Sequence, residues 1–221
     1  MLYLEERRLV LDAAREISKT GMVMGTWGNV SARCEGQDLM VITPSGFSYD
    51  LMTMEDLVIV DSESKVAEGR YQPSVETPLH MQIYRNRPDV RAIVHVHSLY
   101  ATAFAVARQK IPVILEETAQ VVGHEVPVAD YARCGTSMLA DSVVSSLGAE
   151  HRAVLLANHG LVAAGISMEE ALKIACVVEK TARVAVYARG LGNVYSLEDA
   201  DIEILKEKFT SYGQVKIPDR K

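Results

Sequence analysis

The pattern of apolar and polar positions predicts strands and helices that follow one another along the chain. Apolar residues recur at helical spacing from Leu2 to Ile17, and Gly21 follows as a stop signal. Short apolar runs bounded by turn residues predict strands at 29–33, 39–43, 57–61, 66–69, 92–97, 153–158 and 161–165, and residues 125–131 are expected to be extended. Helical patterns are expected at 77–84, 100–107, 136–148 and 168–189, and from residue 196 onward. Several strands are joined by short turns, which indicates an α/β fold whose mixed or mainly antiparallel sheet is flanked by helices.

Composition limits the classes of protein to which this chain can belong. Its 221 residues contain no Pro/Gly/Ser-rich linker and no repeat, so we expect one domain over residues 1–221. The net charge is −6 with both signs interspersed, which argues against a nucleic-acid or membrane partner. The opening segment is charged, unlike a signal peptide, and no apolar run approaches the ~18 residues of a membrane span. Three widely spaced cysteines, Cys34, Cys134 and Cys176, favour a reducing compartment, and we expect a cytoplasmic protein.

Two histidines interrupt an apolar strand pattern in the segment AIVHVHS, residues 92–98. Side chains alternate between the faces of a strand, so His95 and His97 point the same way and Val96 points into a core. A third histidine, His159, follows the apolar run of the segment LLANHGLVAAG. One histidine alone is more often a packed or hydrogen-bonded residue than a ligand. Three together match a catalytic metal site, which has three protein ligands and an open position.

A carboxylate that could act beside such a metal is Glu76, in the segment QPSVETPLH. It precedes a predicted helix, where unpaired N–H groups favour a negative charge, so a simple capping role is the competing interpretation. The functional interpretation is a general acid/base next to a metal. His80 lies four residues later on the same helix face, and we interpret it as a packing residue or as support for the site.

Two glycine-containing loops are suited to hold an anion such as a phosphate. The loop GTWGN offers backbone N–H groups together with Thr26, Gly28 and Asn29, and Ser74 adds a hydroxyl beside Glu76. The loop TPSG offers the same groups from Thr43, Ser45 and Gly46. Neither nucleoside-triphosphate nor dinucleotide binding is supported, because the glycine motifs of those sites are missing.

Together these motifs resemble one known family. The segments GTWGNVSAR, ITPSG, PSVETPLH, AIVHVHS and NHGLVAAG occur in the order and spacing of the class II sugar-phosphate aldolase and epimerase family. The resemblance extends over nearly the whole chain. It implies a three-layer α/β/α fold with a mainly antiparallel central sheet, and a homotetramer with active sites between neighbouring subunits.

The resemblance also implies an activity and a set of functional residues. Zinc, with Mn²⁺ or Co²⁺ as alternatives, would be bound by His95, His97 and His159, with Glu76 as a further ligand and the acid/base. The substrate phosphate would be held by the two loops and Ser74. The implied reaction cleaves a ketose 1-phosphate, L-fuculose 1-phosphate or a similar sugar phosphate, to dihydroxyacetone phosphate and a small aldehyde. A metal supports this reaction because it stabilises the enediolate that cleavage leaves.

Three positions distinguish this chain within the resemblance. The aldolase pattern has two serines before the glutamate, whereas this chain has Ser74 and Val75. A tyrosine of the aldolase pattern that donates a proton to the aldehyde oxygen is matched here by Glu116, while a C-terminal catalytic tyrosine is matched by Tyr212. Glu76 favours an aldolase over the epimerase, which has Asp there.

The alternatives that stay open are a pentulose-5-phosphate 4-epimerase and a phosphate-independent decarboxylase or dehydratase that uses the same metal site. A non-catalytic zinc-containing scaffold is a further alternative.

Overall fold

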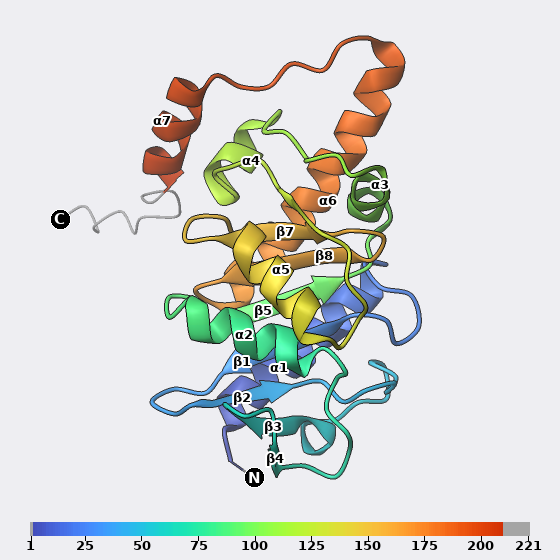
Figure 1. Cartoon of the computed structure of the whole chain (residues 1–221), viewed down its shortest axis with the longest axis vertical. Helices are drawn as coiled ribbons and strands as arrows, with labels where there is room; N and C mark the ends of the chain where they lie inside the picture. The colour runs from blue at the N-terminus through green and yellow to red at the C-terminus, as the bar shows by residue number, and fades with distance from the viewer. Residues whose placement is uncertain (1, 210–221) are drawn as a thin grey trace, which may run out of the picture.

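The computed structural model describes residues 2–209 of the chain (Figure 1), so the catalytic role expected for Tyr212 lies outside the described residues. The helices are α1 (Leu4–Lys19), the 3-10 helix η1 (Met54–Asp56), α2 (Thr77–Asn86), α3 (Leu99–Ala107), α4 (Glu116–Val121), α5 (Ser137–Leu147), α6 (Met168–Leu191) and α7 (Asp199–Phe209). The strands are β1 (Asn29–Arg33), β2 (Leu39–Ile42), β3 (Val58–Asp61), β4 (Val66–Glu68), β5 (Ala92–Val96), β6 (Val128–Ala129), β7 (Ala153–Leu156) and β8 (Gly160–Gly165). Sequence patterns located most of these elements, but they missed η1 and α4.

The strands form one sheet in the order β4-β3-β2-β1-β5-β8-β7-β6. Neighbouring strands from β4 to β7 pair antiparallel, whereas β6 runs parallel to β7. The sheet is therefore mixed, which corrects the expectation of a mainly antiparallel sheet at this edge. The physical reason is the connection: α5 crosses over between β6 and β7, and a helical crossover of this kind joins parallel strands.

Strand β5 lies inside the sheet and is buried along its whole length. Its side chains alternate between two hydrophobic clusters, with Val94 and Val96 in one and Ile93 in the other. The first cluster includes residues of α1 and α6, and the second includes residues of α2 and α5. In Figure 1, α2 and α5 lie in front of the sheet and α1 lies behind it. A strand packed on both sides is a rigid support for the side chains at its ends.

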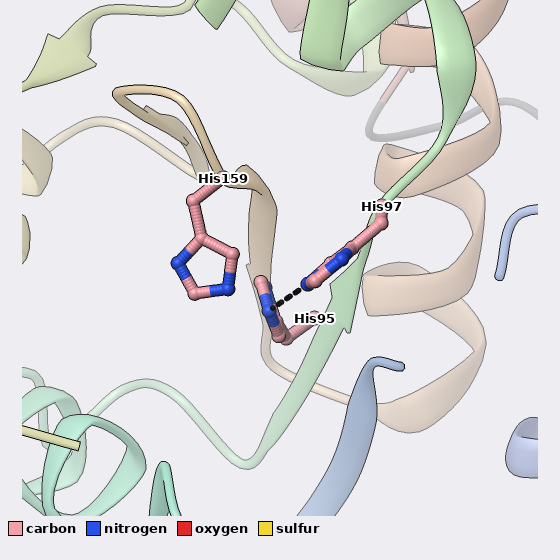
Figure 2. Close-up of side chains that lie close together, drawn as sticks. All are labelled: His95, His97 and His159. Atoms are coloured by element: carbon pink, nitrogen blue, oxygen red, sulfur yellow. Dashed lines mark hydrogen bonds between the residues drawn. The ribbon is translucent and has the colours of Figure 1, made fainter. Parts of the chain in front are cut away.

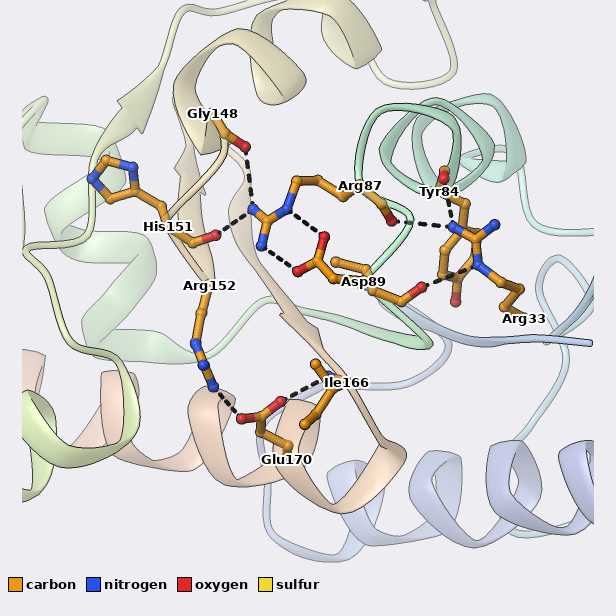
Figure 3. Close-up of polar contacts among 10 residues, drawn as sticks. Arg33, Tyr84, Arg87, Asp89, Gly148, His151, Arg152, Ile166 and Glu170 are labelled. Atoms are coloured by element: carbon orange, nitrogen blue, oxygen red, sulfur yellow. Dashed lines mark hydrogen bonds and ion pairs between the residues drawn. The ribbon is translucent and has the colours of Figure 1, made fainter. Parts of the chain in front are cut away.

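A network of polar contacts holds the segment that leads into β5 (Figure 3). The Arg87 guanidinium donates to both carboxylate oxygens of Asp89 at 2.9 and 2.8 Å. It also donates to the backbone carbonyls of Gly148 at 3.1 Å and His151 at 2.9 Å. Arg33 of β1 donates in turn to the Arg87 carbonyl at 3.2 Å. These contacts connect the end of α2, the start of β5 and the turn after α5.

None of the helices in the described part of the chain combines the length and the apolar character that a membrane crossing requires.

Candidate metal centre

Three histidines from two neighbouring strands converge at the other end of β5 (Figure 2). His95 is in β5 and fully buried, His97 follows the last residue of that strand, and His159 lies in the turn between β7 and β8. Because β5 pairs with β8, this turn comes beside the end of β5. The ring centroids are 4.8 to 4.9 Å apart, and the nitrogen atoms that could ligate a metal lie within 4.8 Å of one another. The structure thus brings together the three histidines that the sequence singled out.

The turn that carries His159 depends on its two neighbours. Asn158 has a φ of 56°, a left-handed conformation that Asn tolerates better than most residues. A Cβ added to Gly160 would lie 2.4 Å from the Val96 carbonyl oxygen and 3.0 Å from Cδ2 of His97. The absence of a side chain at Gly160 therefore lets the turn approach the end of β5, and this approach positions His159.

Glu76 faces this cluster from the N-cap position of α2, where it is 3 % exposed. Its Oε2 lies 3.0 Å from Nε2 of His95, and its Oε1 lies 3.6 Å from Nε2 of His159. The Asn29 amide donates to Oε2 at 2.8 Å, and the pairing of β1 with β5 places Asn29 opposite His95. The carboxylate is therefore held against the histidines by the sheet as well as by its own helix.

The hydrogen bond of His95 to the backbone fixes which ring nitrogen faces the cluster. The Leu161 carbonyl lies 3.0 Å from Nδ1 of His95, and a carbonyl can only accept, so Nδ1 carries a proton. Nε2 of His95 then faces Nε2 of His97 at 3.0 Å and the Glu76 carboxylate. A metal-ligating histidine is commonly oriented in this way by a backbone carbonyl.

The charge states of the remaining groups suit a cation. Burial, assisted by the positive charge of a protonated His95, lowers the pKa of His97 to about 3 and that of His159 to about 4. Both rings are therefore neutral near pH 7, as metal ligation requires. Burial opposes ionisation of Glu76, but the charge and hydrogen bond of His95 hold its pKa below the usual range. Burial opposes protonation of His95, but the charge of Glu76, its hydrogen bond and the hydrogen bond to the Leu161 carbonyl together raise the pKa of His95.

The surroundings of one oxygen atom of Glu76 show whether the histidines and the carboxylate fit a metal. Oε1 of Glu76 is buried and has no hydrogen-bond partner among the described residues. An unpartnered buried carboxylate oxygen is costly unless a cation balances it. Three imidazoles and one carboxylate are a donor set typical of catalytic zinc, and they also suit Mn²⁺ or Co²⁺. The site therefore fits a divalent metal ion.

His80, a second histidine of α2, lies beneath this site and is fully buried. Its Nδ1 lies 2.7 Å from Oγ of Ser31, which also contacts the Tyr84 hydroxyl at 2.8 Å. Burial lowers the pKa of His80 to about 3, so the ring is neutral. These contacts agree with the interpretation of His80 as a packing residue.

The segments expected to bind phosphate meet at one edge of the site. Val30 N–H donates to Oγ1 of Thr43 at 3.3 Å, and Ser74 N–H donates to the Thr43 carbonyl at 3.1 Å. Gly28 has a φ of 110°, and a Cβ there would lie 2.8 Å from the His95 carbonyl oxygen. The start of β1, the end of β2 and the entry to α2 therefore lie together beside the histidines.

Within these segments, the expected phosphate ligands differ in exposure. Thr26, Ser45 and Gly46 are exposed, whereas Asn29, Thr43 and Ser74 are buried. The buried side chains already have protein contacts, because Oγ of Ser74 accepts from Glu76 N–H at 3.3 Å and the amide of Asn29 donates to Glu76. The exposed part of the loops is the part open to a ligand.

The departures from the aldolase pattern lie in two places. Val75 precedes Glu76 and is 60 % exposed, so its side chain faces out at the entry to α2. Glu116 is the first residue of α4, which packs against α6 and α7 rather than against the strands that carry the histidines.

Two residues near the site had no role in the sequence analysis. The Tyr49 hydroxyl donates to the Gly28 carbonyl at 2.5 Å and so supports the loop before β1. Cys134 forms a second group of possible ligands with Glu76 and His159. No spacing in the sequence marks either residue, because both reach the site from loops that only the fold brings near it.

Comparison with known proteins agrees with this geometry. Residues 8–186 match the family described as "Class II Aldolase and Adducin N-terminal domain". The chain is 37% identical to L-fuculose phosphate aldolase of Escherichia coli (strain K12), over 93% of this chain and 94% of that protein. It is 35% identical to 5-deoxy-D-ribulose 1-phosphate aldolase of Bacillus thuringiensis serovar kurstaki, over 97% of this chain and 100% of that protein.

A solved structure of L-fuculose 1-phosphate aldolase superposes with a TM-score of 0.91 at 34% identity, covering 95% of this chain and 98% of that one. The fold and site thus define a metal-dependent lyase. The chain belongs to the class II aldolase family.

Proposed function

We propose that this protein is a zinc-dependent aldolase that cleaves a ketose 1-phosphate to dihydroxyacetone phosphate and a small aldehyde. The observation that carries the proposal is the buried Glu76 carboxylate, which lies beside His95 and His159 of the three-histidine cluster and keeps one oxygen without a hydrogen-bond partner among the described residues. The aldolase relatives, one acting on L-fuculose phosphate and one on 5-deoxy-D-ribulose 1-phosphate by their names, support the same substrate class.

Each group of the site has a role in this reaction. His95, His97 and His159 would hold the ion, which when bound supplies Lewis-acid polarisation of the substrate carbonyl. Glu76 would move a proton at the carbon next to that carbonyl, and the charge and hydrogen bond of His95 outweigh burial and keep the carboxylate in the ionised form that can accept one. Asn29 would orient the Glu76 carboxylate through its hydrogen bond to Oε2.

The loops beside β1 and β2 would bind the substrate phosphate. Exposed Thr26, Ser45 and Gly46 would present hydroxyl and N–H donors to it, and the buried Asn29 and Ser74 would complete the pocket. Val75 is apolar at a position where the aldolase pattern has a serine. This side chain favours a second candidate function, a phosphate-independent decarboxylase or dehydratase that uses the same metal site.

We further propose that the protein is a homotetramer with active sites between neighbouring subunits, and that Tyr212 is a catalytic residue. Large apolar side chains exposed on the segments around the histidines support this: Trp27, Leu99 and Met138 are each at least 67 % exposed. A neighbouring subunit would cover such side chains. We also propose that residues 1–221 form a single domain with a three-layer α/β/α arrangement, and that the protein is cytoplasmic.

The first experiment measures dihydroxyacetone phosphate released from L-fuculose 1-phosphate by zinc-loaded protein, with a chelated sample as control. Chelator-sensitive release is the expected result. A parallel assay with 5-deoxy-D-ribulose 1-phosphate compares the aldehyde half. No release from either substrate, with zinc confirmed in the protein, would contradict the proposed substrate class and favour the phosphate-independent candidate.

A further inference from the structure

A cysteine without an assigned role lies at the edge of the metal centre. Cys134 is exposed, and its Sγ lies within 4.8 Å of ligand atoms of both Glu76 and His159. A thiol, a carboxylate and an imidazole therefore share one small volume. This group overlaps the three-histidine set at His159 but replaces two imidazoles with a carboxylate and a sulfur.

The fold fixes the position of Cys134. A Cβ built on the next residue, Gly135, would lie 3.2 Å from the Val75 carbonyl oxygen, and Gly135 has a φ of 77°. The glycine thus allows this loop to pack against the residue before Glu76. On the other side, Thr136 donates to the Arg133 carbonyl at 2.6 Å and caps α5. The thiol is held beside the entry to α2 rather than on a free loop.

The Glu76 carboxylate, which also belongs to the proposed metal site, is the second feature that points to a ligand here. Oε2 accepts from Asn29 and faces His95, whereas Oε1 faces His159 and has no hydrogen-bond partner among the described residues. The side chain is only 4 % exposed, so water does not readily satisfy this oxygen. A buried carboxylate beside an imidazole and a thiol that hydrogen-bonds to it is suited to a cation.

We propose that Cys134, Glu76 and His159 form a second, softer ligand set that binds a thiophilic divalent cation such as Cd²⁺ or excess Zn²⁺. The proposal rests on the metal site of the proposed function, because the two sets share Glu76 and His159. On binding, a metal–sulfur bond forms and the thiol proton passes to solvent, with no change of oxidation state. An ion in this set occupies the carboxylate that is proposed to move the proton, and it therefore inhibits turnover.

The decisive measurement is the ultraviolet charge-transfer band of a cadmium–thiolate bond. The full-length Cys176→Ser protein is loaded with one equivalent of zinc and titrated with Cd²⁺. Cys176 is removed because it is the other exposed thiol among the described residues, and Cys34 is buried. The expected result is a saturable band that is lost in the Cys134→Ser/Cys176→Ser protein. A missing band, or an equal band in the double variant, would overturn the proposal.

A second variant tests whether the thiol acts with its neighbours or alone. In the Cys176→Ser background, His159→Ala should weaken the Cd²⁺ affinity, measured from the charge-transfer band, by about tenfold or more, because one of three ligands is lost. His151→Ala, which removes a histidine that contacts His124 instead, is the matched control and should leave the affinity unchanged. Equal affinity in the His159→Ala and His151→Ala proteins would contradict the three-residue set.

The band is independent of turnover, so the two proposals can fail separately. If the band behaves as expected but no sugar phosphate is cleaved, the proposed function fails and the second ligand set stands. If cleavage occurs and excess Zn²⁺ inhibits Cys134→Ser as strongly as the parent protein, the second set fails and the aldolase stands.

Discussion

The two ends of β5 use polar side chains in opposite ways. At the start of the strand, the Arg87 guanidinium is matched by Asp89 and by two backbone carbonyls. At the other end, three imidazoles lie close together beside the Glu76 carboxylate, whose Oε1 has no hydrogen-bond partner within residues 2–209. The first arrangement is satisfied by neighbouring groups, whereas the second leaves one buried carboxylate oxygen that a cation would balance. A satisfied polar network contributes stability, while a buried polar group without a partner indicates a binding site.

The largest expected effect comes from a substitution of Glu76, at the histidine end of β5. Glu76→Gln removes the negative charge but keeps the size of the side chain, so turnover of the sugar phosphate should fall about 10²–10⁴-fold. The three histidines are unchanged, so the protein should still bind metal. Steady-state kinetics and metal analysis of the purified variant check both statements. Unchanged turnover would exclude Glu76 as the acid/base.

A substitution in the Arg87 network at the start of β5 should affect stability instead of activity. Arg87→Ala leaves two carbonyls and Asp89 without their partner, and the free energy of unfolding should fall by about 2–4 kcal/mol. Urea unfolding measures the change, and metal affinity at low temperature should stay the same. Arg8→Ala is the control, because its exposed pair with Glu5 contributes little. If Arg87→Ala lost its metal but kept its stability, the contrast between the two ends would be wrong.

The buried His80 gives a smaller effect that depends on pH. Its pKa is lowered to about 3 by burial, whereas the unfolded chain binds the proton near the ordinary value of about 6.5. Between these values the unfolded state takes up a proton that the folded state refuses. The free energy of unfolding therefore decreases as the pH is lowered from about 6.5 towards 3, by about 1.4 kcal/mol per pH unit from this group.

Denaturation of metal-free protein between about pH 6 and pH 4 tests this dependence. His80→Gln should flatten the decline, because Gln does not titrate and can still contact Ser31. An unchanged slope would mean that His80 is protonated in the folded chain.

The smallest expected effect concerns substrate preference. Val75→Ser restores the hydroxyl that the aldolase pattern has next to Ser74, and Val75 is exposed, so the substitution should not disturb packing. One added hydrogen bond to a phosphate should lower KM by about three- to tenfold, with kcat little changed. Kinetics with L-fuculose 1-phosphate measure this. A rise in KM would indicate that the pocket does not hold a phosphate at this position.

Many features of this protein can be predicted from its amino-acid sequence alone. Hydrophobic periodicity located the long helices and most strands, because each of these elements has one face or stripe in the core. The residues of the metal centre were also marked, since His95 and His97 interrupt an otherwise apolar strand. The family resemblance, carried by five segments, was confirmed by the family match over residues 8–186.

Which residues contact one another depends on how the elements pack in three dimensions. The parallel pairing of β6 at the sheet edge, the place of Asn29 against Glu76 and the approach of Cys134 all join segments far apart in the chain. Local patterns report which face of an element is buried, but they carry no information on which loop packs beside it. These contacts depend on strand order and on close approaches at Gly135 and Gly160, and these are fixed only when the sheet and its helices pack together.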